Sequence, residues 1–316
     1  MYRLILIATL LLPCHLAAQT PDCQDIEDDA ERLACYDGVN QAEAKVAAED
    51  TVLEPRQRQE QSLFENSFGI LPHERSYLLP LTYVDKIDQE LFAGLNDPAA
   101  DEELDNLEVK FQYSFKVPIG QRFLLGRDQL YFGFTQLSLW QAYNSDLSSP
   151  FRENNYQPEI LWEVPLSEPL FNGRLSHINW SLIHHSNGLG GDLSRSWNRI
   201  AFATTWADSD WAINLKLWKR IEEDAEDDDN PDIEDFMGYG QLQLGYRWGE
   251  KRFTGIIYNN FESDDNHTSV DISFSMPISR KLRGFIQYFN GYGETLINYN
   301  RRTRRIGIGV VLSDWF

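Results

Sequence analysis

The sequence predicts an all-β fold: an antiparallel twelve-stranded transmembrane β-barrel, preceded by a short helical or disordered N-terminal leader. From residue 76 onward, roughly twelve segments alternate apolar and polar side chains, each near the length that a tilted membrane-spanning strand needs. The connectors between these segments are short and long in turn. No apolar run after the N-terminus could cross a bilayer as a helix. Together these observations favour strands over helices as the membrane-spanning elements.

The N-terminal stretch MYRLILIATLLLPCHLAAQ has the pattern of a secretory signal. It carries a basic Arg3, an apolar core of about a dozen residues and a small-residue end. We therefore expect residues 1–18 to be a signal peptide. Cys14 is an alternative lipoprotein cysteine, but Pro13 stands before it where a small residue is expected.

Residues 19–61 are predicted to form a periplasmic leader, with the barrel occupying residues 62–316. The leader is rich in Glu, Asp, Ala and Gln and poor in large apolar residues, which is typical of a helical or partly disordered segment. Removal of the signal would leave two cysteines, Cys23 and Cys35, in an exported chain. A local disulfide is favoured over a metal site, because a metal would need more ligands.

The clearest strand is VKFQYSFKV, residues 109–117, in which Val, Phe and Tyr alternate with Lys, Gln and Ser. Residues 213–217 and 270–276 repeat the alternation. In a membrane barrel the apolar face meets lipid and the polar face meets the lumen. A soluble sandwich could alternate in the same way. The lengths of the connectors must therefore distinguish a membrane barrel from a sandwich.

The connectors favour a membrane barrel. Segments 208–210, 249–251 and 277–281 are tight, whereas the acidic IEEDAEDDDNPDIEDF between neighbouring strands is long. Outer-membrane barrels combine short periplasmic turns with long exterior loops. The last segment, residues 306–316, ends on a phenylalanine, which resembles the recognition signal of such barrels. An even strand count then puts both termini in the periplasm and the long loops outside.

The candidate site is HHSNGLGGDLSRSWN, residues 184–198. On this strand count, His184 and Ser186 end the fifth strand, near the exterior rim. They share the register of the apolar residues of their strand, and Asn198 does so on the next strand, so all three are expected to face lipid. Polar groups on that face cost free energy unless they are paired, which favours a hydrogen-bonded trio. His185 falls in the lumen register and is expected to be structural.

The trio fits ester hydrolysis. The Ser186 hydroxyl would attack an ester carbonyl, His184 would take its proton and return it to the leaving alkoxide, and Asn198 would fix the imidazole tautomer. The alternative to catalysis is that these residues are the ordinary polar ends of two strands, joined by SNGLGG, a sequence typical of turns. Spacing alone leaves both interpretations open.

At these residues the chain resembles the outer membrane phospholipase A family. The active-site motif of the family stands here as HHSNG and SRSWNR, and the likeness continues in SSPFRENNYQPE, DDNPDIEDFMGYGQLQLGY and NGYGETLINYN. It covers most of residues 76–316. The resemblance implies a twelve-stranded barrel that hydrolyses sn-1 and sn-2 acyl esters of phospholipids and lysophospholipids with Ca²⁺. It makes His184 the base, Ser186 the nucleophile and Asn198 the orienting asparagine.

The resemblance also implies a homodimer with calcium at the subunit interface. Ser194 and the Leu189 carbonyl match calcium ligands of one subunit, and Ser148 matches the ligand that the partner supplies. The Gly188 amide is a companion donor to the oxyanion. Gln141 matches a dimer-interface glutamine on the outer face of the barrel, although a glutamine beside a tryptophan is also an ordinary neighbour of an aromatic belt.

Other interpretations belong to different classes. A passive diffusion porin would use the polar lumen, and an adhesion barrel would use its acidic loops, Glu222–Asp229 above all. A net charge of −21 argues against a nucleic-acid partner, because such binding needs Lys and Arg to neutralise phosphates. The loop departs from the family pattern at Gly190, Gly191 and Asp192, which leaves its calcium affinity open.

Overall fold

The structure, a computed structural model, falls into two compact units, residues 1–49 and 50–316. The residues that it describes are 26, 28–33, 35–36, 51–64, 69–92, 103–226, 228–279 and 282–316. In the first unit Cys35 is disulfide-bonded. Its predicted partner Cys23 and the predicted signal peptide lie outside the described residues. None of the described helices combines the length and apolar character that crossing a bilayer requires.

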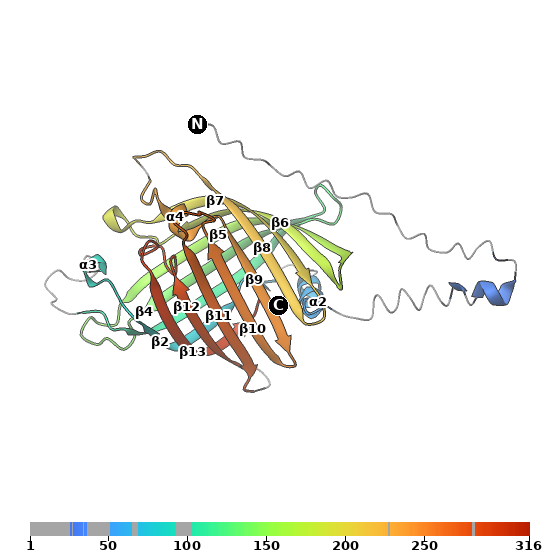
Figure 1. Cartoon of the computed structure of the whole chain (residues 1–316), viewed down its shortest axis with the longest axis horizontal. Coiled ribbons are helices and arrows are strands. Elements are labelled where there is room, and N and C mark those ends of the chain that lie inside the picture. The colour runs from blue at the N-terminus through green and yellow to red at the C-terminus, as the bar shows by residue number, and fades with distance from the viewer. Residues whose placement is uncertain are drawn as a thin grey trace. The chain divides into compact units, whose positions relative to one another are not determined.

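The second unit is a closed antiparallel β-barrel (Figure 1). Each strand from β2 to β13 pairs with its neighbour in sequence, and β13 pairs back to β2, so the described chain closes with twelve strands. The short β1 (Leu71–Pro72) pairs with β3 beside β2. This confirms the predicted fold class. The strands are β2 Ser76–Val84, β3 Leu107–Gln121, β4 Gln129–Trp140, β5 Phe151–Leu170, β6 Gly173–Ser186, β7 Ser196–Ala207, β8 Trp211–Ile221, β9 Gly240–Trp248, β10 Lys251–Asn259, β11 Thr268–Pro277, β12 Arg283–Gly291 and β13 Thr303–Ser313.

Turns and loops segregate to opposite ends of the barrel. The β5–β6 and β7–β8 connectors, residues 171–172 and 208–210, are short and lie at the end where β2 begins and β13 ends. The β6–β7 and β8–β9 connectors, residues 187–195 and 222–239, lie at the opposite end. We call these the short-turn end and the long-loop end. Short turns and long loops therefore lie at opposite ends of the barrel, as the alternating connector lengths in the sequence predict.

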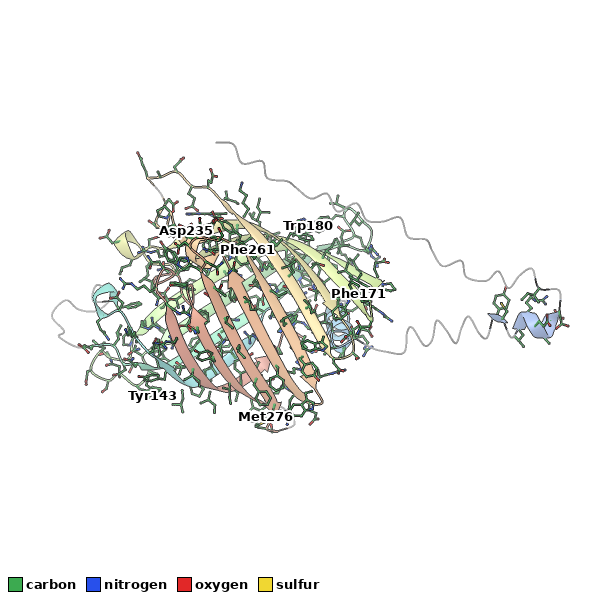
Figure 2. The ribbon with its side chains drawn as sticks, in the orientation of Figure 1. Tyr143, Phe171, Trp180, Asp235, Phe261 and Met276 are labelled. Atoms are coloured by element: carbon green, nitrogen blue, oxygen red, sulfur yellow. The ribbon has the colours of Figure 1, made fainter. Side chains whose placement is uncertain are left out.

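Side-chain alternation puts apolar groups outside and polar groups inside. On β3, Lys110 and Lys116 are buried in the lumen, whereas the intervening Tyr113 is 50% exposed. Trp180 and Met276, labelled in Figure 2, belong to the exposed apolar set of the other strands. A surface that is apolar on every strand is stable only against lipid or another apolar surface.

Ion pairs cross the lumen. Glu108 accepts from Arg152 at 2.6 Å and pairs with Arg305 at 2.7 Å. Glu294, in the loop before β13, pairs with Lys110 at 2.9 Å and with Arg305 at 2.6 Å. Burial alone would raise the pKa of Glu294, but Arg305 and Lys110 lower it to about 2. The carboxylate is therefore charged at neutral pH, and the network joins β3, β5 and β13, which do not pair directly with one another.

A helix, α2 (Glu54–Phe64), binds at the short-turn end. Arg56 donates to the Pro72 carbonyl and to the Asp314 carbonyl, both at 2.8 Å, and Glu60 lies 3.0 Å from the ammonium group of Lys116. The predicted boundary between residues 61 and 62 falls inside this helix, so that boundary is wrong: the barrel unit begins at residue 50. The error has a physical cause. A helix that binds a polar lumen needs no apolar stripe, and its composition resembles that of a leader.

Candidate active site

The site begins with two residues that face each other across neighbouring strands. His184 on β6 pairs directly with Asn198 on β7, and His184 Nδ1 lies 2.9 Å from Asn198 Oδ1. Their same-face neighbours Leu182 and Ile200 are 53% and 57% exposed, so the pair stands on the outer wall of the barrel. The amide oxygen can only accept, so the ring nitrogen donates and carries the proton. The parity argument from sequence thus puts both side chains on the correct face.

Ser186 follows on the same face of the same strand. Two residues of a strand advance about 6.6 Å, which places its hydroxyl one pleat from the imidazole. Its register partners are Tyr156 on β5 and Ser196 on β7. Among the described residues, no hydrogen bond joins Ser186 to His184. Such bonds are often long before substrate binds, so the arrangement agrees with a resting nucleophile and base.

Asn187 organises the loop that follows β6, and sequence analysis missed it. Its side chain is 3% exposed and makes three hydrogen bonds within the loop. Its Oδ1 accepts from the amides of Leu189 at 3.3 Å and Arg195 at 3.0 Å, and its Nδ2 donates to the Leu193 carbonyl at 2.8 Å. One asparagine therefore sets the path of residues 187–195. An asparagine directly between two candidate residues, Ser186 and Gly188, was the signal available in the sequence.

Gly188 lies at the turn of this loop with a φ of 68°. An added Cβ would meet the ring of Tyr156 at 3.0 Å, so both conformation and space favour glycine. Its amide donates to no other described residue. That amide is one residue beyond Asn187 and two beyond the candidate nucleophile, so it is a candidate donor to an oxyanion.

The predicted calcium ligands lie in two loops. Leu189 and Ser194 belong to the β6–β7 loop, and Ser148 belongs to the β4–β5 loop, residues 141–150. The Leu189 carbonyl and the Ser194 hydroxyl make no hydrogen bond with any other residue in the described ranges. Ser148 is exposed and has a φ of 58°, an uncommon conformation for serine that often marks functional sites. The described residues contain no group of three or more His, Cys, Asp or Glu that could hold a metal.

Gln141 does not lie on the outer face, and this prediction is wrong. Its side chain is fully buried, and its amide donates to the Glu108 carboxylate at 3.0 Å and to the Asp105 carbonyl at 2.9 Å. Residue 141 directly follows β4 and continues the lumen-facing odd register of that strand. The glutamine in the outward register is Gln136, which donates to Ser138 Oγ at 3.1 Å.

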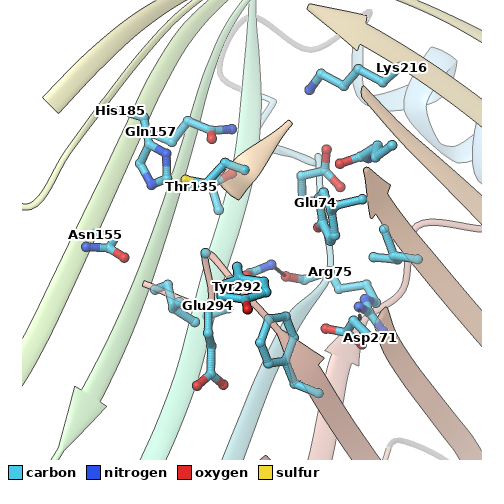
Figure 3. Close-up of a pocket in the computed structure, with 18 of the residues that line it drawn as sticks. Glu74, Arg75, Thr135, Asn155, Gln157, His185, Lys216, Asp271, Tyr292 and Glu294 are labelled. Carbon is cyan, nitrogen blue, oxygen red and sulfur yellow. Dashed lines mark hydrogen bonds and ion pairs between the residues drawn. The ribbon is translucent and has the colours of Figure 1, made fainter. Parts of the chain in front are cut away.

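His185 lines a cavity of about 200 Å³ in the lumen, together with Arg199, Lys110 and Glu294 (Figure 3). Its Nδ1 accepts from the Trp197 indole at 3.3 Å. Its side chain therefore lies on the inner side of the wall, as its register predicts. The candidate chemistry and the lumen are on opposite faces of β6.

A residue of the acidic β8–β9 loop completes the site. Glu223 Oε1 accepts a hydrogen bond of 2.8 Å from Asn198 Nδ2, so Asn198 is held between the imidazole and a carboxylate. Sequence analysis treated this loop as a run of charge. Strand register could have indicated Glu223. Ile221 pairs with Asn198, and residue 223 continues the same outward face.

Comparison with known proteins identifies relatives over most of the chain. A family model described as Phospholipase A1 matches residues 53–312. The putative phospholipase A1 of Neisseria meningitidis is 35% identical over 257 residues, a match that spans 78% of this chain and 66%, just under two thirds, of that protein. Phospholipase A1 of Escherichia coli K12 is 34% identical over 252 residues, covering 80% of this chain and 84% of that protein.

Solved structures give the same result. The outer membrane phospholipase A of Escherichia coli superposes with a TM-score of 0.73 at 33% identity, covering 80% of this chain and 95% of that chain. An outer membrane phospholipase of Salmonella typhi, a dimer with bound calcium, has a TM-score of 0.73 at 32% identity, covering 79% of this chain and 94% of that one. The match of residues 53–312 includes the barrel, the candidate trio and the loops around it, and the resemblance noted in the sequence is confirmed: the chain belongs to the phospholipase A1 family.

Proposed function

We propose that this protein hydrolyses acyl esters of phospholipids in the outer membrane with Ser186 as nucleophile, His184 as base and Asn198 as orienting residue. The observation that carries the proposal is the 2.9 Å hydrogen bond between His184 and Asn198 on the outer wall, two residues from Ser186. Polar side chains facing lipid are costly and are usually functional. A solved variant of the E. coli enzyme, an active-site asparagine-to-alanine mutant, adds support for an asparagine in this role.

The chemistry follows from the two ring nitrogens. With the proton on Nδ1 held by Asn198, Nε2 has a free lone pair and accepts the Ser186 proton as the hydroxyl oxygen attacks the ester carbonyl. The Gly188 amide donates to the oxyanion that forms. The tetrahedral intermediate collapses, His184 protonates the departing alkoxide, and an acyl-serine remains. Water, deprotonated by His184, then attacks the acyl-serine and releases the fatty acid.

The position of the site indicates its substrates. The trio stands on the barrel wall, so a lipid reaches it from the bilayer and not through the lumen. An open wall imposes little selection between the two acyl positions. We therefore include sn-1 and sn-2 esters and lysophospholipids among the substrates.

We further propose that the enzyme uses calcium in a homodimer. The Leu189 carbonyl and the Ser194 hydroxyl of one subunit would hold the ion together with Ser148 of the other. Oxygen donors in a flexible loop suit calcium, which accepts several oxygen ligands without strict geometry. When bound, the ion would supply positive charge beside the developing oxyanion. The calcium-bound dimer of the Salmonella typhi relative supports this assignment.

The long-loop end would face the exterior, with both termini in the periplasm. Outer-membrane barrels have short periplasmic turns, and the short-turn end here holds the start of β2 and the end of β13. His184 and Ser186 lie at the long-loop end of β6, so the site would act on the outer leaflet. The N-terminal leader would then be periplasmic.

The test is fatty-acid release from phospholipid in mixed micelles by the refolded full-length protein, combined with organophosphate labelling. We expect release of fatty acid and a single labelled peptide containing Ser186. A diffusion porin would instead conduct ions in a planar bilayer, release no fatty acid and resist labelling. That outcome would replace the enzyme with the porin interpretation.

Gln136 provides a test of the dimer face. It lies in the outward register of β4 and donates to the buried Ser138, which in turn donates to Asn154 Oδ1 at 2.7 Å. Such groups are better accommodated against a second subunit than against lipid. Gln136→Ala is therefore expected to reduce the calcium-dependent cross-linking yield several-fold. The control is Gln141→Ala, which leaves the buried Glu108 with one hydrogen-bond partner fewer. It should lower the free energy of unfolding by about 1–3 kcal/mol without affecting the yield of cross-linked dimer. An unchanged cross-linking yield in Gln136→Ala would show that Gln136 is not part of the dimer interface.

A further inference from the structure

The acidic loop after β8 contains one carboxylate that differs from its neighbours. Glu222 and Asp224 are exposed, whereas Glu223 is half-buried and accepts the 2.8 Å hydrogen bond from Asn198 Nδ2. Asn198 Oδ1 is meanwhile bound to His184. A carboxylate, an amide and an imidazole thus lie in a row on the outer wall.

The backbone holds this row in place. Asn198 pairs with Ile221 at the end of β8, and Glu223 lies two residues further along the same outward register. The rest of the loop is anchored to the barrel twice: Arg220 pairs with Asp228 at 2.5 Å, and the buried Asn230 accepts from the Ser196 amide at 3.0 Å. Ser196 is itself two residues from Asn198. Glu223 is therefore presented by a loop that is fastened beside the site.

We propose that Glu223 is a positioning residue: it fixes which end of the Asn198 amide faces His184, and thereby sets the tautomer of the imidazole. The inference rests on the proposed hydrolysis by Ser186, His184 and Asn198, and adds a fourth member that acts only through the asparagine.

The argument depends on the two ends of an amide. An asparagine side chain can rotate by half a turn about its last bond and exchange oxygen for nitrogen with little change in shape. Rotated in this way, Asn198 would donate to Nδ1, and the ring proton would move to Nε2. An imidazole protonated at Nε2 cannot accept the Ser186 proton, so the rotated state is inactive.

A carboxylate removes this ambiguity because it only accepts hydrogen bonds. Glu223 therefore requires the Nδ2 end of Asn198 and would repel the Oδ1 end. The Oδ1 end is then directed to His184, whose Nδ1 must carry the proton. This leaves the Nε2 lone pair for the nucleophile. The role of Glu223 is distinct from a general effect of charge, since Glu222 and Asp224 carry the same charge in the same loop.

The experiment compares kcat and KM for phospholipid in mixed micelles across Glu223→Ala, Glu223→Gln and the control Glu222→Ala. Because one hydrogen bond is lost, we expect Glu223→Ala to lower kcat about twofold to tenfold and to leave KM within about twofold. Glu223→Gln keeps an acceptor of the same length but also offers a donor, and should recover part of kcat. Glu222→Ala should match the unmodified protein.

A double-mutant cycle with Asn198→Ala supplies the decisive readout. If Glu223 acts only through Asn198, then Glu223→Ala has no further effect on kcat once Asn198 is alanine. A loop that merely needs its charge or its shape would show the same loss in both backgrounds, and that result would overturn the inference. So would an unchanged kcat in Glu223→Ala, or an equal loss in Glu222→Ala. Heat-modifiable mobility on gels verifies that each variant is a folded barrel.

Failure of the proposed function looks different from failure of this inference. If the unmodified protein releases no fatty acid, or if Ser186→Ala retains full activity, the catalytic assignment itself is wrong. If Ser186→Ala is inactive and Glu223→Ala matches the unmodified protein, only the role of Glu223 is wrong.

Discussion

Replacement of Ser186 by alanine is expected to lower the rate of ester hydrolysis by about a thousandfold or more, and to leave the barrel folded. The hydroxyl is the attacking group, and neither His184 nor a bound water can reproduce a covalent acyl intermediate at that position. The side chain lies on the outer wall and makes no hydrogen bond with another described residue, so little stability is lost. Initial rates in mixed micelles, with heat-modifiable mobility as the measure of folding, report both quantities.

Ser196→Ala is the matched control for this experiment. Ser196 is the register partner of Ser186 on β7 and lies in the same outward register as Asn198. Only its backbone amide bonds to Asn230, and alanine retains that amide. We expect near-normal activity and organophosphate labelling in Ser196→Ala, and neither in Ser186→Ala. Full activity without Ser186, or its loss without Ser196, would move the nucleophile away from residue 186.

Removal of calcium is expected to lower activity by at least about a hundredfold, because a missing oxyanion contact alone costs about that much. Calcium binding and dimerisation are linked if each site draws on both subunits, so either should strengthen the other by mass action. Ser194→Ala should therefore raise the calcium concentration for half-maximal activity and lower the cross-linking yield together. Hydrolysis and cross-linking, measured across one calcium titration, test both effects.

The supply of Ser148 by the partner needs a separate test. Leu147 and Leu189 pack against the same buried cluster, which contains Phe92, so the two ligand-bearing loops also approach each other within one chain. Mixed dimers of Ser148→Ala and Ser194→Ala protomers separate the two arrangements. If ligands come from both subunits, the mixed dimer has one complete site and regains activity that neither variant has alone. If activity is not regained, or if the native protein keeps full activity with a calcium chelator present, a calcium site shared between the subunits is excluded.

The barrel itself is determined by local patterns in the sequence. Successive side chains of a strand point to opposite faces, so a period of two in hydrophobicity specifies both the strand and its lipid-facing side. Connector lengths then indicate which strand ends lie together. The same parity placed His184 and Asn198 on the outer wall and His185 in the lumen, because one strand fixes the face of every residue in it.

Beyond the end of a strand, the tertiary structure decides what a side chain contacts. Gln141 follows the last residue of β4 and keeps the lumen register of that strand, and its contact with Glu108 overturns the outer-face position that the family resemblance implied. The polar helix α2 belongs with the barrel because it binds Lys116 in the lumen and the Pro72 and Asp314 carbonyls at the short-turn end, contacts that its composition does not reveal.

The hydrogen-bond partners of the candidate site residues likewise depend on the tertiary structure. Glu223 reaches Asn198 only because β8 pairs with β7 in one register and the loop beyond it is anchored through Asn230. The pairing of Lys110 with Glu294 joins residues 184 positions apart. The sequence alone determined which residues face lipid, since that depends on neighbours along one strand. Which loop carboxylate meets which amide depends on strand register and loop path, and only the closed barrel specifies both.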